Sequence, residues 1–136
     1  MKKSNGFSLI ELMIVIVIIG VLLSISVPAY NNYVQEARRA DAHAALLDIA
    51  AREERFVAQN NTYTTDISSA AGLNLDRNTS AEEFYNMTVT PCAGGTIATC
   101  YVITATGVGS QAQDDGCTTI TYDSAGTKSG ATANCW

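Results

Sequence analysis

The stretch KKSNGFSLIELMIVIVIIG, residues 2 to 20, decides the fold of this chain. One glutamate, Glu11, lies within its run of apolar residues, where an ionised carboxylate surrounded by hydrocarbon costs on the order of a few kcal/mol. A charge of this kind marks a functional site by default, because a partner must offset its cost. The junction between Gly6 and Phe7, just before the apolar run, separates it from a short basic leader.

The apolar run itself predicts a helix that crosses a membrane. Residues 7–27 are almost wholly apolar, and a helix of that length spans about 30 Å, which matches a bilayer core. Lys2 and Lys3 precede it, which places the N-terminus in the cytoplasm and the rest of the chain outside. A secretory signal peptide is the alternative, and residues 27–29 loosely resemble its cleavage site. We disfavour it, because the run is longer than a signal core, the helical pattern continues beyond it, and Glu11 lies inside it.

The composition limits what the remainder of the chain can do. Its 136 residues fit one small domain and one long helix. The net charge is −5, and after Arg55 only Arg77 and Lys128 are basic, against seven acidic residues. Such a surface does not attract phosphate backbones, so direct DNA binding is disfavoured. We find no catalytic group and no phosphate-binding loop in the sequence, and His43, the only histidine, is expected to be an ordinary surface residue. We therefore expect a protein that is not an enzyme and carries no cofactor.

The helical pattern continues from Tyr30 to about Ala58, where the composition becomes amphipathic. Apolar residues recur there at steps of three, four and seven, which is typical of helix faces. They form two sets, one of Tyr30, Val34, Ala37, Ala44 and Leu47 and the other of Leu46, Ile49 and Phe56. One stripe is expected to cover a sheet, and the other can pack against neighbouring helices. Turn-forming residues 60–64 end the helix.

The C-terminal region predicts a small antiparallel sheet laid on this helix. A loop from residue 63 to about 83 precedes three runs rich in β-branched and aromatic residues, at 84–90, 100–106 and 118–122. Residues 123–126 predict a turn after the third run. The fold class is therefore α+β.

Four cysteines lie in the same region, namely Cys92, Cys100, Cys117 and Cys135. None has the C-x-x-C spacing of a zinc site, so no metal is expected. An even number in a short, loop-rich region indicates disulfides formed outside the cytoplasm. Three connectivities are possible, and our hypothesis is the pairing of neighbours, Cys92–Cys100 and Cys117–Cys135.

The N-terminal residues also carry a family resemblance. Gly6-Phe7-Ser8-Leu9-Ile10-Glu11, after a basic leader, resembles the prepilin motif of type IV pilins and related pseudopilins, although the family more often has Thr where this chain has Ser8. The resemblance implies that a prepilin peptidase cuts between Gly6 and Phe7 and N-methylates Phe7. It also implies that Glu11 meets the N-terminal amine of a neighbouring subunit during assembly, and a paired carboxylate is tolerable in lipid.

Gly20 and Pro28 continue this resemblance. Proline removes a helical hydrogen bond and kinks the chain, and glycine costs roughly 1 kcal/mol relative to alanine. One interpretation is that the helix bends or partly melts here when subunits leave the membrane. The other is that they are ordinary membrane-helix residues, in which both types are common.

A second resemblance lies in the C-terminal half. The run from Asp115 to Lys128 and the ending Cys135-Trp136, together with residues 38–42, resemble small type IVa minor pilins, a group related to the competence pilin that binds DNA. The resemblance implies the pilin fold, in which a long N-terminal helix packs on a small antiparallel sheet with a disulfide-closed C-terminal region.

Together these features predict four segments: a leader at 1–6, a membrane and assembly half of the helix at 7–28, an amphipathic half at 29–58, and an exported β domain at 59–136. The implied function is that of a structural subunit, perhaps best described as a minor pilin, of a bacterial type IV pilus that supports adhesion or twitching motility. Its implied partners are the prepilin peptidase, other pilin subunits, the inner-membrane assembly machinery and membrane lipid. The alternatives are a DNA-binding minor pilin for natural transformation and a pseudopilin of a type II secretion system.

Overall fold

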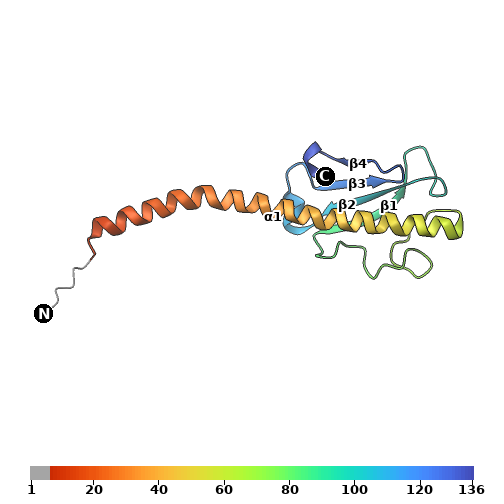
Figure 1. The fold of residues 1–136 in the computed structure, drawn as a ribbon, viewed down its shortest axis with the longest axis horizontal. Helices are drawn as coiled ribbons and strands as arrows, with labels where there is room; N and C mark the ends of the chain where they lie inside the picture. The colour runs from red at the N-terminus through yellow and green to blue at the C-terminus, as the bar shows by residue number, and fades with distance from the viewer. Residues whose placement is uncertain (1–6) are drawn as a thin grey trace. The chain divides into compact units, whose positions relative to one another are not determined.

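The structure is a computed structural model that describes residues 7–136, so the leader and Gly6 lie outside the described residues. Its first element is helix α1, Leu9–Asn60 (Figure 1). The strands and short 3-10 helices that follow are β1 (Tyr85–Pro91), β2 (Tyr101–Gly107), η1 (Gly109–Gln113), β3 (Thr119–Asp123), β4 (Lys128–Gly130) and η2 (Ala133–Cys135). The chain divides into two compact units, one ending at Val34 and the other running from Gln35 to Trp136, and each is described by itself.

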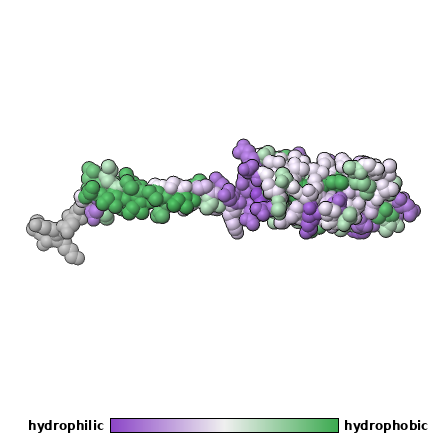
Figure 2. Space-filling view, turned by 90° about the horizontal axis from the view of Figure 1, so that it is seen from above, coloured by the Kyte–Doolittle hydropathy of each residue, from purple (hydrophilic) through white to green (hydrophobic). Residues whose placement is uncertain are grey.

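The first unit consists of the apolar part of α1. Its most apolar window of 18 residues has a mean hydropathy of 2.9, and none of that window is buried within the protein. By length and composition, this is the one helix among the described residues that could cross a membrane. Figure 2 shows its surface as an almost continuous hydrophobic stretch. Two serines interrupt it, but the hydroxyl of Ser24 donates to the carbonyl of Val21 at 2.7 Å and that of Ser26 to Leu22 at 2.8 Å, so both are satisfied within the helix.

The second unit contains the amphipathic part of α1 and a four-stranded sheet with the order β1-β2-β3-β4, in which all neighbours are antiparallel. The three expected strands are confirmed with shifts of about one residue at their ends. The short strand β4 was not expected, because Lys-Ser-Gly has no β-branched or aromatic residue to signal it.

The turn between β3 and β4 is what places that fourth strand. The side chain of Asp123 accepts hydrogen bonds from the backbone N–H groups of Ala125 at 2.9 Å and Thr127 at 2.8 Å. Gly126 has a φ of 81°, which residues other than glycine rarely adopt. The predicted turn is therefore confirmed, and it returns the chain so that Lys128 pairs with Tyr122.

The hydrophobic core lies between the sheet and one face of α1. Side chains alternate along β1 and β2 between buried and more exposed positions, as one covered face requires. The helix contributes Leu46 and Ile49 to this core, whereas Leu47 keeps 46% of its surface exposed. The expectation that the two apolar sets form two different faces is confirmed. The buried side chains of the sheet are Tyr85, Met87, Val89, Tyr101, Ile103, Ala105 and Ile120.

Residues 61–84, which we call the connector, join α1 to β1 and carry part of the core. Asn61 closes the helix in a left-handed conformation, with φ 56° and its N–H 2.8 Å from the carbonyl of Val57. Ile67 and Leu73 are buried, and the N–H of Leu73 donates to the carbonyl of Asp66 at 3.0 Å. The connector is therefore a packed part of the second unit, although it contains no helix and no strand.

Two disulfides close the β domain, Cys92–Cys100 with a Cα–Cα distance of 5.6 Å and Cys117–Cys135 with 5.4 Å. This is the pairing of neighbours that the sequence hypothesis favoured. Cys117 and Cys135 are fully buried, and Gly130 lies so close that an added Cβ would come within 2.6 Å of the Cβ of Cys135. The second bridge is therefore part of the core, whereas Cys92 and Cys100 are only half-buried.

We expect the two disulfides to contribute unequally to stability. Replacing Cys117 and Cys135 by alanine should lower the free energy of unfolding by about 3–4 kcal/mol, because the bridge closes the longer loop and its sulfurs are buried. The matched replacement of Cys92 and Cys100 should cost about 2 kcal/mol. Urea unfolding of the fragment from Gln35, in both variants and the parent, measures the difference. An equal loss, or a larger loss for the half-buried bridge, would contradict this ranking.

Candidate assembly site and its attachment to the globular unit

Glu11 lies in the first turn of α1, and its carboxylate has a partner within the chain. Its Oε2 accepts a hydrogen bond from the backbone N–H of Ser8 at 3.2 Å, and Ser8 immediately precedes the first helical residue, Leu9. Ser-x-x-Glu at a helix start is the sequence signature of a capping box, in which the glutamate satisfies one of the free N–H groups of the helix end. The sequence analysis missed this role, although the spacing of Ser8 and Glu11 signals it. Glu11 makes no ion pair among the residues that the structure describes.

The helix surface beside Glu11 is apolar and uncovered. Phe7 is 88% exposed, and every large apolar side chain from Leu9 to Val27 is exposed as well. Exposed apolar surface of this extent is rare on soluble proteins and marks an interface with lipid or with other proteins. The site therefore combines an uncovered greasy helix with one carboxylate at its beginning.

A buried ion pair attaches the second half of α1 to the region after β2. Arg39 donates to both carboxylate oxygens of Asp114, from Nη2 at 2.6 Å and from Nε at 2.7 Å. Asp114 is 1% exposed and also accepts a hydrogen bond from Nε2 of Gln111 at 2.7 Å. The hydrogen bond with Asp114 raises the pKa of Arg39 above its ordinary value, and burial opposes that effect. Two-pronged pairing of this kind fixes the direction of both side chains.

The neighbouring residues of the 38–42 segment make further attachments. Arg38 donates to the hydroxyl of Ser110 at 2.6 Å, and its guanidinium lies 4.2 Å from the ring centroid of Phe84. Asp41 accepts from the backbone N–H of Glu82 at 3.3 Å. The charged segment that resembles minor pilins is therefore a structural fastening between the helix, η1 and the end of the connector.

His43 is not the ordinary surface residue that the sequence analysis expected. Its ring stacks on Trp136 with centroids 4.5 Å apart and an interplanar angle of 7°, and its Nε2 lies 2.7 Å from the carbonyl oxygen of Cys135. Lys128 places its ammonium 4.8 Å from the Trp136 ring centroid, and Arg39 donates to the carbonyl of Asn134 at 3.1 Å. The fold thus gathers three basic side chains around the C-terminal segment, which the sequence separates by up to 89 positions.

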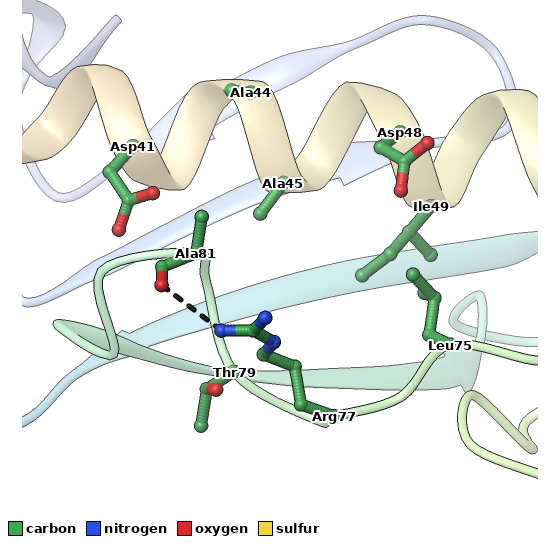
Figure 3. A pocket seen from close by; sticks show the side chains of 9 residues that line it. All are labelled: Asp41, Ala44, Ala45, Asp48, Ile49, Leu75, Arg77, Thr79 and Ala81. Atoms are coloured by element: carbon green, nitrogen blue, oxygen red, sulfur yellow. Dashed lines mark hydrogen bonds between the residues drawn. The ribbon is translucent and has the colours of Figure 1, made fainter.

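A groove of about 280 Å³ runs between α1 and the connector (Figure 3). Its floor is apolar, and Asp41 and Asp48 lie at its helix side. Asp48 accepts a hydrogen bond from Arg52 at 3.1 Å, and Arg77 donates across the groove to the carbonyl of Ala81 at 3.1 Å. The polar groups here already have partners within the chain, and no pairing of a nucleophile with a base is formed among the nine lining residues. No group of three or more metal-ligating side chains occurs in residues 7–136.

Comparison with known proteins identifies the family. Residues 28–121 match the family described as type IV minor pilin ComP, DNA uptake sequence receptor, and residues 1–27 match the prokaryotic N-terminal methylation motif. The chain belongs to this type IV minor pilin family. Its fold agrees, because a type IV pilin from Shewanella oneidensis superimposes with a TM-score of 0.51 at 25% sequence identity, over 75% of this chain and 97% of that one.

Individual relatives resemble the chain mainly through its N-terminal part. The fimbrial protein EcpC of Eikenella corrodens is 34% identical over 105 residues, 77% of this chain and 63% of that protein. A fimbrial protein of Moraxella nonliquefaciens is 52% identical over 42 residues, 31% of this chain and 27% of that protein. The type II secretion system core protein G of Aeromonas hydrophila is 39% identical over 67 residues, 47% of this chain and 45% of that protein. The chain thus spans between about a quarter and two thirds of the length of these relatives.

We expect Asp114→Asn to destabilise the second unit by about 2–4 kcal/mol, because it leaves the partly buried Arg39 without its counter-charge. Asp115→Asn is the matched control, since Asp115 is exposed and its loss should cost less than about 0.5 kcal/mol. Urea unfolding of fragments that begin at Gln35 measures both values. Equal stability of the Asp114 variant and the control would show that the ion pair contributes nothing net.

Proposed function

We propose that the protein is a minor subunit of a bacterial type IV pilus. Before assembly it is held in the inner membrane by the apolar part of α1, with its N-terminus in the cytoplasm, and afterwards it lies in the extracellular filament. The observation that carries the proposal is the uncovered apolar helix with a single carboxylate, Glu11, in its first turn. Membership of the minor pilin family supports it.

The first step of the proposed pathway is cleavage between Gly6 and Phe7 by a prepilin peptidase, followed by N-methylation of Phe7. The match of residues 1–27 to the methylation motif supports this step. Phe7 and Ser8 precede the helix and are exposed, so the new N-terminus is not buried by the chain itself. Cleavage releases an α-amino group with a reference pKa of roughly 7.7–8.0, which is mostly protonated at neutral pH.

The second step is an exchange of partners at Glu11. In the single chain its carboxylate accepts the N–H of Ser8, which is a neutral donor and leaves the negative charge without a counter-charge. In the filament, the methylated amine of a neighbouring subunit supplies that counter-charge, and hydrogen bonds between charged groups are about twice as strong as neutral ones. Glu11 then sets the register of one helix against the next. The other pilin subunits and the inner-membrane assembly machinery are the partners in this step.

Gly20 and Pro28 are proposed to let α1 adapt when it moves from lipid to the filament. An added Cβ at Gly20 would meet no atom within 4 Å in the single chain, so its small size is not required by packing there. Proline at position 28 has no N–H to donate to the carbonyl of Ser24, one turn earlier. Both residues weaken the helix within its apolar half, which supports local bending over a rigid rod.

We expect Glu11→Ala to abolish or strongly reduce filament assembly, while membrane insertion and leader cleavage continue. The reason is that the variant keeps the apolar helix and the cleavage junction but loses the counter-charge for the incoming amine. Immunoblots of membrane and sheared-filament fractions, with electron microscopy of the cells, measure the two steps separately.

The control is Glu36→Ala, which removes an exposed carboxylate from the same helix outside the apolar part. It should enter filaments as the parent does. Normal incorporation of the Glu11 variant would refute the assigned role.

A second candidate function, DNA uptake, is favoured by the description of the matched family as a DNA uptake sequence receptor. The net charge of −5 opposes general DNA binding. The tertiary structure nevertheless gathers His43 and Lys128 around Trp136, and a cation beside an exposed aromatic ring suits a phosphate and a base. This edge of the sheet is where DNA contact would be sought. Similarity to a type II secretion core protein is confined to about half the chain, so we rank the pseudopilin alternative below both.

The second candidate predicts salt-sensitive binding of DNA by the fragment from Gln35 in mobility-shift assays. Lys128→Glu should then weaken binding by roughly tenfold or more at low salt, because it reverses a phosphate contact. Arg77→Glu is the matched control, since Arg77 lies in the groove beside the connector and not at this edge. Absence of a shift at low salt, or equal weakening by both changes, would exclude the DNA role at this edge.

A further inference from the structure

The buried carboxylate of Glu53 holds the beginning of the connector against the end of α1. Glu53 has 0% of its surface exposed, although it is an acidic residue on a helix. Its Oε2 accepts the backbone N–H of Thr64 at 3.1 Å, and its Oε1 is buried with no hydrogen-bond partner among the described residues. Acidic side chains are almost never fully buried unless they are paired. This carboxyl is therefore in a place that favours its neutral, protonated form.

The groups around Glu53 supply no positive charge to compensate it. On α1 its neighbour is Glu54, a second carboxylate. From the connector and from β2, the hydroxyls of Tyr63 and Tyr101 face this pair of acids and donate to Oε1 of Glu54 at 3.4 Å and 3.5 Å. Burial raises the pKa of both tyrosines, and the acids raise it further, so both stay neutral at ordinary pH.

The two arginines nearest in sequence are engaged or exposed. Arg52 donates to Asp48 at 3.1 Å and to the carbonyl of Leu73 at 3.3 Å. Arg55 lies on an exposed part of the helix. An ionised Glu53 would thus be a buried charge without a salt bridge in the part of the chain that the structure describes, which is strongly unfavourable.

We propose that Glu53 is a proton-controlled latch, which holds the connector on α1 when the carboxyl is protonated and releases residues 61–64 when it ionises. The contact itself is a single hydrogen bond to Thr64 at the point where the chain leaves the helix. Its release reaches further, because the adjacent N–H of Tyr63 donates to the carbonyl of Ile97 at 3.2 Å. Ile97 lies within the loop closed by Cys92 and Cys100. The latch therefore joins three segments that are distant in sequence.

The direction of the pH effect follows from the environment of the carboxyl. Burial raises the pKa of Glu53 from 4.5 to about 7, with the hydrogen bond from Thr64 opposing this and the charge of Glu54 adding to it. In the opened state the carboxyl meets water and regains an ordinary pKa. The closed state retains the proton longer, so its advantage is complete below about pH 4.5, declines as the pH rises toward 7, and is lost above that value.

Amide hydrogen exchange of the full-length chain in detergent micelles tests the latch. After correction for the intrinsic exchange rate, protection of residues 61–66 should fall roughly 50-fold between pH 5 and pH 8. Strand β2 of the same molecule provides the reference, because its protection should change much less. Glu53→Gln keeps the shape and the acceptor for Thr64 but cannot ionise, so its protection should be nearly independent of pH.

Glu54→Gln is the matched control, because it alters the neighbouring exposed carboxylate and should retain most of the fall. A direct NMR titration of the Glu53 carboxyl in the parent chain provides a second measurement that needs no variant. A pKa well above the ordinary value, together with loss of the pH dependence in Glu53→Gln, supports the latch. An ordinary pKa in the parent, or the same fall in protection in parent and Glu53→Gln, overturns it.

Discussion

The constraint on which this molecule depends is the uncovered apolar surface of α1. The side chains from Leu9 to Val27 are exposed, and at roughly 25 cal/mol for each Å² of apolar surface, contact of the whole stretch with water is strongly unfavourable. The chain must place this surface in lipid or against other helices. Glu11 is the one acidic residue within the stretch, so its charge distinguishes one apolar environment from another, depending on whether a cation is offered there.

The same helix has a different task from Gln35 onward, where it forms one wall of a small core. Apolar packing alone places Leu46 and Ile49 against the sheet, but polar contacts fix how the helix sits on it. The Arg39–Asp114 pair and the His43–Trp136 stack attach the helix to segments that follow β2 and β4. A two-pronged ion pair and a stacked ring pair are directional, so they specify one arrangement where apolar contacts would tolerate several.

The comparisons agree with this division of the helix. The methylation motif covers the part that ends at residue 27, and the minor pilin family covers residues 28–121, where the attachments to the sheet are made. Similarity to fimbrial and secretion proteins alike is concentrated in the N-terminal part. The apolar helix is thus the feature that such assemblies share, whereas the contacts around Trp136 and Glu53 belong to the part in which the individual pilin differs.

The sequence by itself determined the long helix, its apolar first part, three strands, the turn at Asp123 and the α+β class, because each depends on local periodicity or turn chemistry. It also indicated Glu11 as the candidate assembly residue, since the cost of a charge in hydrocarbon is visible without coordinates. It did not reveal that Glu11 caps its own helix, although Ser8 signalled this, nor the strand β4, whose residues have little strand preference. Only the tertiary structure decided that Arg39 meets Asp114, that His43 stacks on Trp136 and that Glu53 is buried. These contacts join residues far apart in the chain or depend on which side of the helix the sheet covers, and a local pattern contains neither kind of information.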